Sequence, residues 1–234
     1  MNNRGTVLIV GAGKGIGESI ALKLAEDGHD LIITYLKNEA NAKKLASKIK
    51  EKLLCKVNIV KLDFKNRNLV EPFDEIEKYI ESPLIGLVNN IGVSHDRVSF
   101  DKIDEKTFME IIDVNIFGAY QISKFAVKNM LKNNENNLSA SIVNISSQVA
   151  LYGGNYLSLY ASSKAWLNTF TISLAKEIGP NGIRVNAISP GPVNLGATQN
   201  DLYHDKINQI PLRRLCIPQD IANLASFLIS DKSS

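Results

Sequence analysis

The sequence is poor in the residues that build metal centres, disulfide frameworks and membrane spans. It contains only two cysteines, Cys55 and Cys216, and only three histidines among 234 residues. Two isolated cysteines form neither a metal-ligand spacing nor a disulfide framework, which predicts no bound metal and favours a reducing cytosol. No apolar run approaches the roughly 20 residues of a membrane helix, and the first apolar stretch is too short for a secretion signal. We therefore expect a cytoplasmic protein with no membrane partner.

The chain also has little excess of positive over negative charge. The chain has 27 lysines and arginines against 24 acidic residues, so its formal net charge is +3, and the lysines are spread along the chain. This balance argues against a nucleic-acid partner. The hydrophobic share of 44% is ordinary for a soluble globular protein. With no linker and no repeat, residues 1–234 are expected to form a single domain.

Short β-branched runs alternate with longer amphipathic stretches along the chain. This pattern predicts the α/β class, as a single doubly wound Rossmann-type parallel sheet with helices on both faces. Strands are predicted at Thr6–Val10, Asp30–Tyr35, Val57–Asp63, Gly86–Asn89, Ser141–Ser146 and Ile183–Ile188. Helices are predicted at Ile16–Asp27, Glu39–Lys52, Val70–Glu81, Glu105–Lys132, Tyr160–Ile178 and Pro218–Ile229. Gly118 would only interrupt the packing surface of the longest helix. After the last predicted helix the given sequence stops at Ser234, where this pattern would call for another strand, so that strand is expected to be absent.

A glycine-rich turn, residues 11–17, follows the first predicted strand and precedes a helix. Its spacing is Gly-x-x-x-Gly-x-Gly through Gly11, Gly15 and Gly17. Glycines allow the backbone to approach a pyrophosphate, and a helix N-terminus supplies free N–H groups and the positive end of its dipole. The turn therefore predicts a nucleotide site, with a tight structural turn or a methyl-donor site as alternatives.

The end of the second predicted strand bears on which nucleotide is bound. An acidic residue there usually holds the free ribose 2′-hydroxyl of NAD(H), but no carboxylate occurs before Glu39. Lys14 and Lys37 are instead placed to face a 2′-phosphate. These residues favour NADP(H), the alternative being two solvated surface lysines.

Tyr160 and Lys164 lie one helical turn apart on the same predicted helix face. A tyrosine hydroxyl has an unperturbed pKa of about 10, and a cation held close to it lowers that pKa. The pair can then act as a proton donor and acceptor, although an exposed helix pair is the plain alternative. Ser147 ends a predicted strand, at the edge where open sheets bind ligands, and its hydroxyl can polarise a carbonyl. The neighbouring Ser146 is an equal candidate by these criteria.

With these residues the chain resembles the short-chain dehydrogenase/reductase family, from about Thr6 to Ser230. In that family the catalytic serine lies 13 residues before the tyrosine, which selects Ser147. The family's Asn-Asn-Ala-Gly stretch appears here as residues 89–92, Asn-Asn-Ile-Gly. Its helical asparagine, its adenine-contacting aspartate and its Pro-Gly pair match Asn115, Asp63 and residues 190–191.

The resemblance implies a role for each residue of the reaction centre. Tyr160 protonates the carbonyl oxygen while NADPH supplies a hydride, and Ser147 orients that oxygen. Lys164 lowers the pKa of the tyrosine and binds the nicotinamide ribose, and Asn115 holds a water that links Lys164 to solvent. With the glycine turn and the two lysines included, the candidate cofactor-binding residues are Gly11, Gly13, Lys14, Gly15, Ile16, Gly17, Tyr35, Lys37, Asp63, Phe64, Asn90, Gly92, Tyr160, Lys164, Pro190, Gly191 and Val193.

The chain departs from the family pattern at several places. Val10 and Leu195 replace customary threonines, Ile91 replaces a small alanine, and the final strand with its Asp-Gly-Gly-like ending is missing. These departures concern the cofactor region and assembly and leave the serine, tyrosine and lysine intact. His95 is interpreted as polar surface, and Tyr156 as a wall of the substrate pocket, which residues 93–97 and 196–209 are expected to frame.

The similarity is strongest to 3-oxoacyl-(acyl carrier protein) reductases, including residues 211–215 and 219–222. It implies reduction of a 3-oxoacyl thioester, with Lys128 and Lys132 in a basic patch for the acidic carrier near the active-site mouth. Solvated lysines are the alternative for those two residues. The resemblance also implies a homo-oligomer, a tetramer or dimer built on the two long helices. Other functions left open are a reductase of a small alcohol, sugar or steroid-like ketone, and a nucleotide sensor without turnover.

Overall fold

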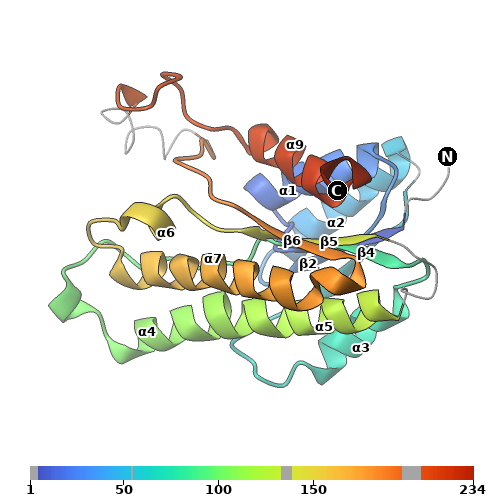
Figure 1. Cartoon of the computed structure of the whole chain (residues 1–234), viewed down its shortest axis with the longest axis horizontal. Coiled ribbons are helices and arrows are strands. Elements are labelled where there is room, and N and C mark those ends of the chain that lie inside the picture. The colour runs from blue at the N-terminus through green and yellow to red at the C-terminus, as the bar shows by residue number, and fades with distance from the viewer. Residues whose placement is uncertain (1–4, 54, 133–138, 197–206) are drawn as a thin grey trace.

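The computed structural model describes residues 5–53, 55–132, 139–196 and 207–234, and it contains a sheet of six parallel strands (Figure 1). The strand order is β3-β2-β1-β4-β5-β6, so the chain reverses direction across the sheet after β3. The strands are β1 (Thr6–Val10), β2 (Asp30–Tyr35), β3 (Val57–Lys61), β4 (Leu84–Asn89), β5 (Ala140–Ile145) and β6 (Ile183–Ile188). This arrangement confirms the predicted α/β class with a doubly wound sheet.

Helices cover both faces of this sheet (Figure 1). They are α1 (Gly15–Glu26), α2 (Glu39–Leu53), α3 (Val70–Lys78), α4 (Glu105–Ile111), α5 (Ala119–Leu131), α6 (Val149–Tyr152), α7 (Ser158–Ile178) and α9 (Pro218–Ile229). Alternate residues of each strand face opposite layers. Val7 and Ile9 of β1 pack in the cluster with α1, α2 and α9, whereas Leu8 and Val10 pack in the cluster with α3, α5 and α7. All four side chains are buried, which explains why the strand is apolar from Val7 to Val10.

The segment predicted as one long helix from 105 to 132 is not a continuous α-helix. Its middle, Ile112–Gly118, is a π-helix labelled η2 that joins α4 to α5. π-helical turns are rare and occur frequently at functional sites. Gly118 at its end has more than a packing-surface role, because a Cβ there would lie 2.8 Å from the Phe64 ring and 2.9 Å from Ile91. Close approach of the loops after β3 and β4 therefore requires a glycine.

The carboxyl ends of the strands meet at one edge of the sheet, where the loops leading into α1, α4, α6 and α7 gather (Figure 1). In parallel α/β sheets this edge, at the point where strand order reverses, is where ligands bind. Within the part of the chain that the structure describes, no helix is long and apolar enough to cross a membrane.

Candidate active site

The ammonium group of Lys164 is the most buried charge of the candidate site. Its side chain rises from α7, is only 3% exposed, and donates hydrogen bonds to the carbonyl oxygens of Ile91 at 3.0 Å and Ile145 at 2.8 Å. Burial lowers the pKa of Lys164 from its usual value near 10.5 to about 8. The helix thus holds this nitrogen against the ends of β4 and β5, 6.0 Å from the centre of the Tyr160 ring.

Asn115 lies in the π-helix and faces the same point. Its Oδ1 accepts from the backbone N–H of Val93 at 2.8 Å, and its Nδ2 donates to the carbonyl of Val93 at 2.9 Å. Nδ2 also donates to the hydroxyl of Ser163 at 2.9 Å. Both protons of the amide are therefore committed to protein groups, and the side chain fixes the loop after β4 to the helix that carries Lys164.

The structure separates the two candidate serines. Ser146 is buried and its hydroxyl donates to the carbonyl of Lys164 at 3.2 Å, so it fastens β5 to α7. Ser147, one residue further, is half-buried, and its Oγ lies 3.4 Å from the backbone nitrogen of Val149, which donates to it. Among the described residues, the hydroxyl of Ser146 donates to a carbonyl, whereas the hydroxyl of Ser147 only accepts. Tyr160 is also half-buried, in the first turn of α7.

The glycine turn forms the entry to α1 at the same edge of the sheet. Gly17 is buried, and a Cβ at that position would lie 2.2 Å from the carbonyl oxygen of Gly11. The Nδ2 of Asn90 donates to that same oxygen at 3.0 Å, which joins the loop after β4 to the turn. No side chain caps the first turn of α1, whose N-cap residue is Lys14. The backbone N–H groups of this turn therefore point to where a phosphate could accept from them.

At the end of β2 three side chains interact with one another, which the sequence did not predict. The phenol of Tyr35 is hydrogen-bonded to the carboxylate of Glu39, which also pairs with Lys43 at 2.6 Å. Burial, followed by the nearby Glu39 carboxylate, raises the pKa of Tyr35. A carboxylate thus does lie beside the end of β2, although a lysine pairs with it. Lys14 and Lys37 are exposed, and no ion pair engages either of them among the described residues.

The other predicted cofactor residues also lie at this edge. Asp63 follows β3 and accepts from the backbone N–H of Lys65 at 3.0 Å, whereas Phe64 is only 4% exposed and packs in the core. Exposed Gly92 lies beside Lys164, since a Cβ on it would be 3.0 Å from the ammonium nitrogen. The segment after β6 is held by a bridge between Val193 and Cys216. Pro190 accepts from the backbone N–H of Gln148, and Gly191 lies close to the side chain of that glutamine.

A family model described as enoyl-(acyl carrier protein) reductase matches residues 11–234. The "uncharacterized oxidoreductase YmfI" of Bacillus subtilis is 32% identical over 98% of this chain and 93% of its own length. The 3-oxoacyl-[acyl-carrier-protein] reductase FabG of Staphylococcus epidermidis is 32% identical over 97% of this chain and 92% of its own. The chain belongs to the short-chain dehydrogenase/reductase family.

Structural similarity agrees with this assignment to the short-chain dehydrogenases/reductases. The 3-ketoacyl-(acyl-carrier-protein) reductase from Brucella melitensis, solved in complex with NADH, superimposes with a TM-score of 0.88. The two chains are 26% identical, and the match covers 99% of this chain and 93% of the other. The protein is thus an oxidoreductase of this family, and the predicted resemblance is confirmed.

Two lysines predicted to lie near the active-site mouth of this short-chain dehydrogenase/reductase do not lie there. Lys128 and Lys132 occupy the end of α5 that leads towards the start of β5, whereas Ser147 follows the other end of β5 (Figure 1). Lys132 is also paired with Glu77 at 2.5 Å. Of the two alternatives that the sequence left open for these lysines, their position within this chain favours solvated surface residues, because helix spacing shows which residues share a face and not which end of the sheet they reach. A carrier patch at the mouth of this chain cannot be built from these two residues.

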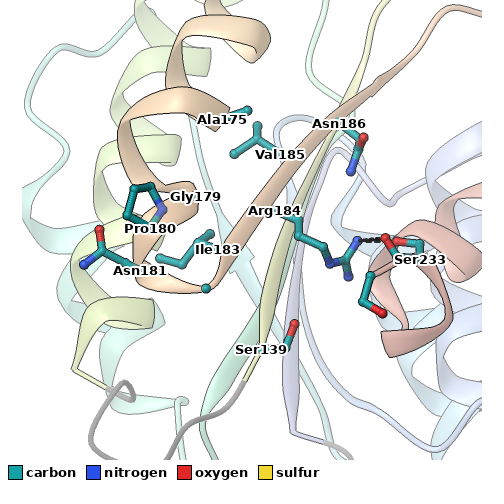
Figure 2. Close-up of a pocket in the computed structure, with 12 residues that line it drawn as sticks. Ser139, Ala175, Gly179, Pro180, Asn181, Ile183, Arg184, Val185, Asn186 and Ser233 are labelled. Atoms are coloured by element: carbon teal, nitrogen blue, oxygen red, sulfur yellow. Dashed lines mark hydrogen bonds between the residues drawn. The ribbon is translucent and has the colours of Figure 1, made fainter.

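The described residues also form an open groove of about 850 Å³ along β6, away from the reaction centre (Figure 2). Arg184 dominates this groove, and its guanidinium donates to the carbonyls of Leu228 at 2.8 Å and Ser230 at 3.1 Å. It therefore satisfies the last carbonyls of α9. Arg184 therefore helps to attach α9 to the sheet, together with the apolar residues of α9 and a hydrogen bond from the Ser141 hydroxyl to the Leu228 carbonyl, and it lies outside the candidate site.

Residue types and spacing did not reveal the groups that hold the reaction centre together. Val93 and Ser163 clamp Asn115, and the carbonyls of Ile91 and Ile145 hold Lys164. Four of these contacts use main-chain atoms, for which no residue type gives a signal. Ser163, inside the segment between Tyr160 and Lys164, carried the only signal in the sequence. No cluster of three possible metal ligands occurs among the described residues.

Proposed function

We propose that the protein reduces a carbonyl group to a hydroxyl with NADPH, acting on a 3-oxoacyl thioester bound to a carrier protein. The observation that carries this proposal is the convergence of Ser147, Tyr160 and buried Lys164 at the carboxyl ends of β4 and β5. The glycine turn before α1 opens on the same edge of the sheet. A carbonyl bound between Ser147 and Tyr160 would therefore lie beside a nucleotide held by the turn.

The turn before α1 fits a dinucleotide. Its backbone N–H groups at the start of α1 have no side-chain cap. Gly17 has no Cβ, which allows the main chain to approach the carbonyl oxygen of Gly11 closely. Bound there, the reduced nicotinamide supplies a hydride, with its two electrons, for the carbonyl carbon. Asp63, Asn90 and Gly92 are our candidates for contacts to the adenosine and nicotinamide halves, together with the segment 190–193.

In the proposed reaction the chain's own groups handle the oxygen and its proton. Ser147 donates a hydrogen bond to the carbonyl oxygen and polarises it. Tyr160 gives its phenolic proton to that oxygen as the new C–H bond forms, which completes the alcohol. The positive charge of Lys164 stabilises the resulting phenolate. Asn115 keeps the loop after β4 and the helix of Lys164 in register through its contacts with Val93 and Ser163.

The preference for NADPH rests on charge at the ribose site. Lys14 and Lys37 are exposed on the two segments that flank it, and the Glu39 carboxylate there is paired with Lys43. A 2′-phosphate would gain two charge-assisted hydrogen bonds from the lysines. Because the Brucella melitensis relative was solved with NADH, both nucleotides belong in the assay. Equal efficiency with the two would overturn the NADPH preference without affecting the reductase assignment.

The substrate is proposed from two of the named relatives, the Staphylococcus epidermidis 3-oxoacyl and the Brucella melitensis 3-ketoacyl carrier-protein reductases. Turnover of a carrier-bound 3-oxoacyl thioester supports it, whereas turnover of small free ketones alone points to a small-molecule reductase. The matching family model is described as an enoyl reductase, so a 2-enoyl thioester is the necessary comparison substrate. Reduction of the carbon–carbon double bond alone would overturn our proposal, since in the proposed reaction Tyr160 protonates a carbonyl oxygen and not a carbon.

We propose that the chain acts as a homo-oligomer, a tetramer or dimer, in the cytoplasm. Exposed apolar side chains occur on the helices α4, α5 and α7, which run side by side (Figure 1): Phe108, Tyr120 and Ile172 are 44%, 42% and 59% exposed. A second copy packing on these helices would bury them. Light scattering coupled to size exclusion tests this: a mass of one chain at micromolar concentration would contradict it.

A further inference from the structure

A single buried hydroxyl connects the π-helix to the turn that carries Tyr160 and Lys164. Ser163 is only 2% exposed, and its Oγ lies 2.9 Å from the Nδ2 of Asn115 and 2.8 Å from the carbonyl oxygen of Tyr160. Asn115 is equally buried, at 2% exposure. The link therefore lies in a region from which water is largely excluded.

The direction of each hydrogen bond in this link is fixed by donor and acceptor chemistry. Oδ1 of Asn115 must face the N–H of Val93, because a rotated amide would set two donors against each other there and two acceptors at the carbonyl. Nδ2 is then a donor to Ser163, so the serine oxygen accepts. The only proton of that hydroxyl is left for the carbonyl of Tyr160. One arrangement satisfies all of these groups.

We propose that Ser163 is a positioning residue for the reaction centre. Its hydroxyl sets the distance between Asn115 and the backbone of Tyr160, and through that turn it sets where the phenol and the ammonium stand relative to each other. This inference rests on the proposed function, since it assumes that Tyr160 is the proton donor. Among the described residues, the hydrogen bonds of Ser163 reach Asn115 and Tyr160 and not the glycine turn or the end of β2, so we assign it no direct part in holding the nucleotide.

The proposal differs from a purely structural role in what it predicts for kinetics. Replacing Ser163 by alanine leaves a buried Nδ2 proton of Asn115 without an acceptor. If Asn115 and the Tyr160 turn shift relative to each other, the proton donor loses its alignment, and small misplacements of this kind can cost about a hundredfold in rate. A structural role alone would lower thermal stability and the fraction of active protein, while each correctly folded molecule kept its kcat.

The test compares Ser163→Ala with Ser162→Ala in the full chain. Ser162 is the neighbouring, exposed residue of the same helix, which makes it a matched control. For each variant, kcat per nucleotide-binding site, KM for substrate and the dissociation constant of NADPH are measured. We expect Ser163→Ala to lower kcat ten- to a hundredfold, with NADPH affinity within about twofold, and Ser162→Ala to match the wild type.

A double-mutant cycle with Asn115→Ala decides whether Ser163 acts through Asn115. The proposal expects the double variant to have the kcat of Asn115→Ala alone, since the serine then has no amide to hold. Multiplicative losses would overturn the proposal, as would an unchanged kcat in Ser163→Ala. In both cases the wild type still turns over, so the proposed function stands. Absence of turnover in the wild type would overturn the proposed function and this inference together.

Discussion

The ammonium nitrogen of Lys164 lies 2.8 Å from the carbonyl oxygen of Ile145, the last residue of β5. This contact fixes a charged group of α7 at the end of a central strand, one residue before Ser146 and two before Ser147. The end of β5, which precedes Ser147, and the first turns of α7, which carry Tyr160 and Lys164, therefore lie next to each other. Among the described residues, the hydrogen-bond partners of the Lys164 ammonium group are the main-chain carbonyls of Ile91 and Ile145, and not a carboxylate.

Burial of Lys164 has a consequence for stability that depends on pH. Its pKa is lowered to about 8 in the folded protein, below the value of about 10.4 in an unfolded chain. The destabilisation is fully present below pH 8 and disappears as pH rises to about 10.5, because the folded lysine loses its proton first. Between pH 7 and pH 11 we expect wild type to gain about 3 kcal/mol in unfolding free energy relative to Lys164→Met. Urea titrations of both proteins measure this, and parallel pH curves would contradict it.

Removal of the phenolic hydroxyl should separate chemistry from binding. Tyr160→Phe keeps the ring but has no proton to give to the substrate oxygen. We expect kcat to fall by about a hundred- to ten-thousandfold, while the dissociation constant of NADPH, followed by its fluorescence, stays within about twofold. Near-normal turnover in this variant would remove Tyr160 from the role of proton donor.

The glycine turn offers a test that does not depend on the substrate. A methyl group at Gly17 would lie 2.2 Å from the oxygen of Gly11, whereas nothing lies within 4 Å of the position that a methyl group would take at Gly179. Gly17→Ala should therefore distort the turn and abolish NADPH binding at micromolar concentrations. Gly179→Ala should bind as the wild type does. Isothermal titration of the two variants checks this, and equal affinities would show that the nucleotide does not use the turn.

Charge at the ribose site should determine the nucleotide preference. Lys37→Ala removes a cation that we place beside the 2′-phosphate, and Lys44→Ala removes an exposed one from α2 as a control. A hydrogen bond to a charged group contributes about 1.5–3 kcal/mol, so we expect Lys37→Ala to raise the KM for NADPH at least tenfold. The KM for NADH should not change. If both nucleotides respond equally, Lys37 does not contact the 2′-phosphate.

Much of the fold follows from local patterns. β1, β2 and β6 begin and end at the predicted residues. β1 and β2 are apolar runs buried on both faces, which contrast with the polar turns around them. The π-helix at 112–118 was not predicted, because a segment of seven residues is too short for its period to be distinguished from that of the α-helices on either side. The four-residue helix α6 was missed because it is too short to show a period.

The residues whose side chains would take part in the reaction could be predicted from the sequence. The main-chain groups that hold those side chains in place could not. Tyr160 and Lys164 could be paired from their spacing, and the resemblance to the family, whose serine lies 13 residues before the tyrosine, selected Ser147 over Ser146. The contacts of Lys164 with two carbonyls depend on which strands end side by side. The pairing of Glu39 with Lys43 beside Tyr35 needed the geometry of the β2–α2 turn, because the sequence places that carboxylate four residues past the strand end.

The central claim is tested most directly by following NADPH oxidation with a carrier-bound 3-oxoacyl thioester, beside a 2-enoyl thioester and a panel of small ketones. The account predicts saturable turnover of the 3-oxoacyl thioester with formation of the 3-hydroxy product, and loss of that turnover in Tyr160→Phe. It would be contradicted if the wild type bound NADPH tightly and reduced none of these carbonyls, or if Tyr160→Phe reduced them as fast as the wild type.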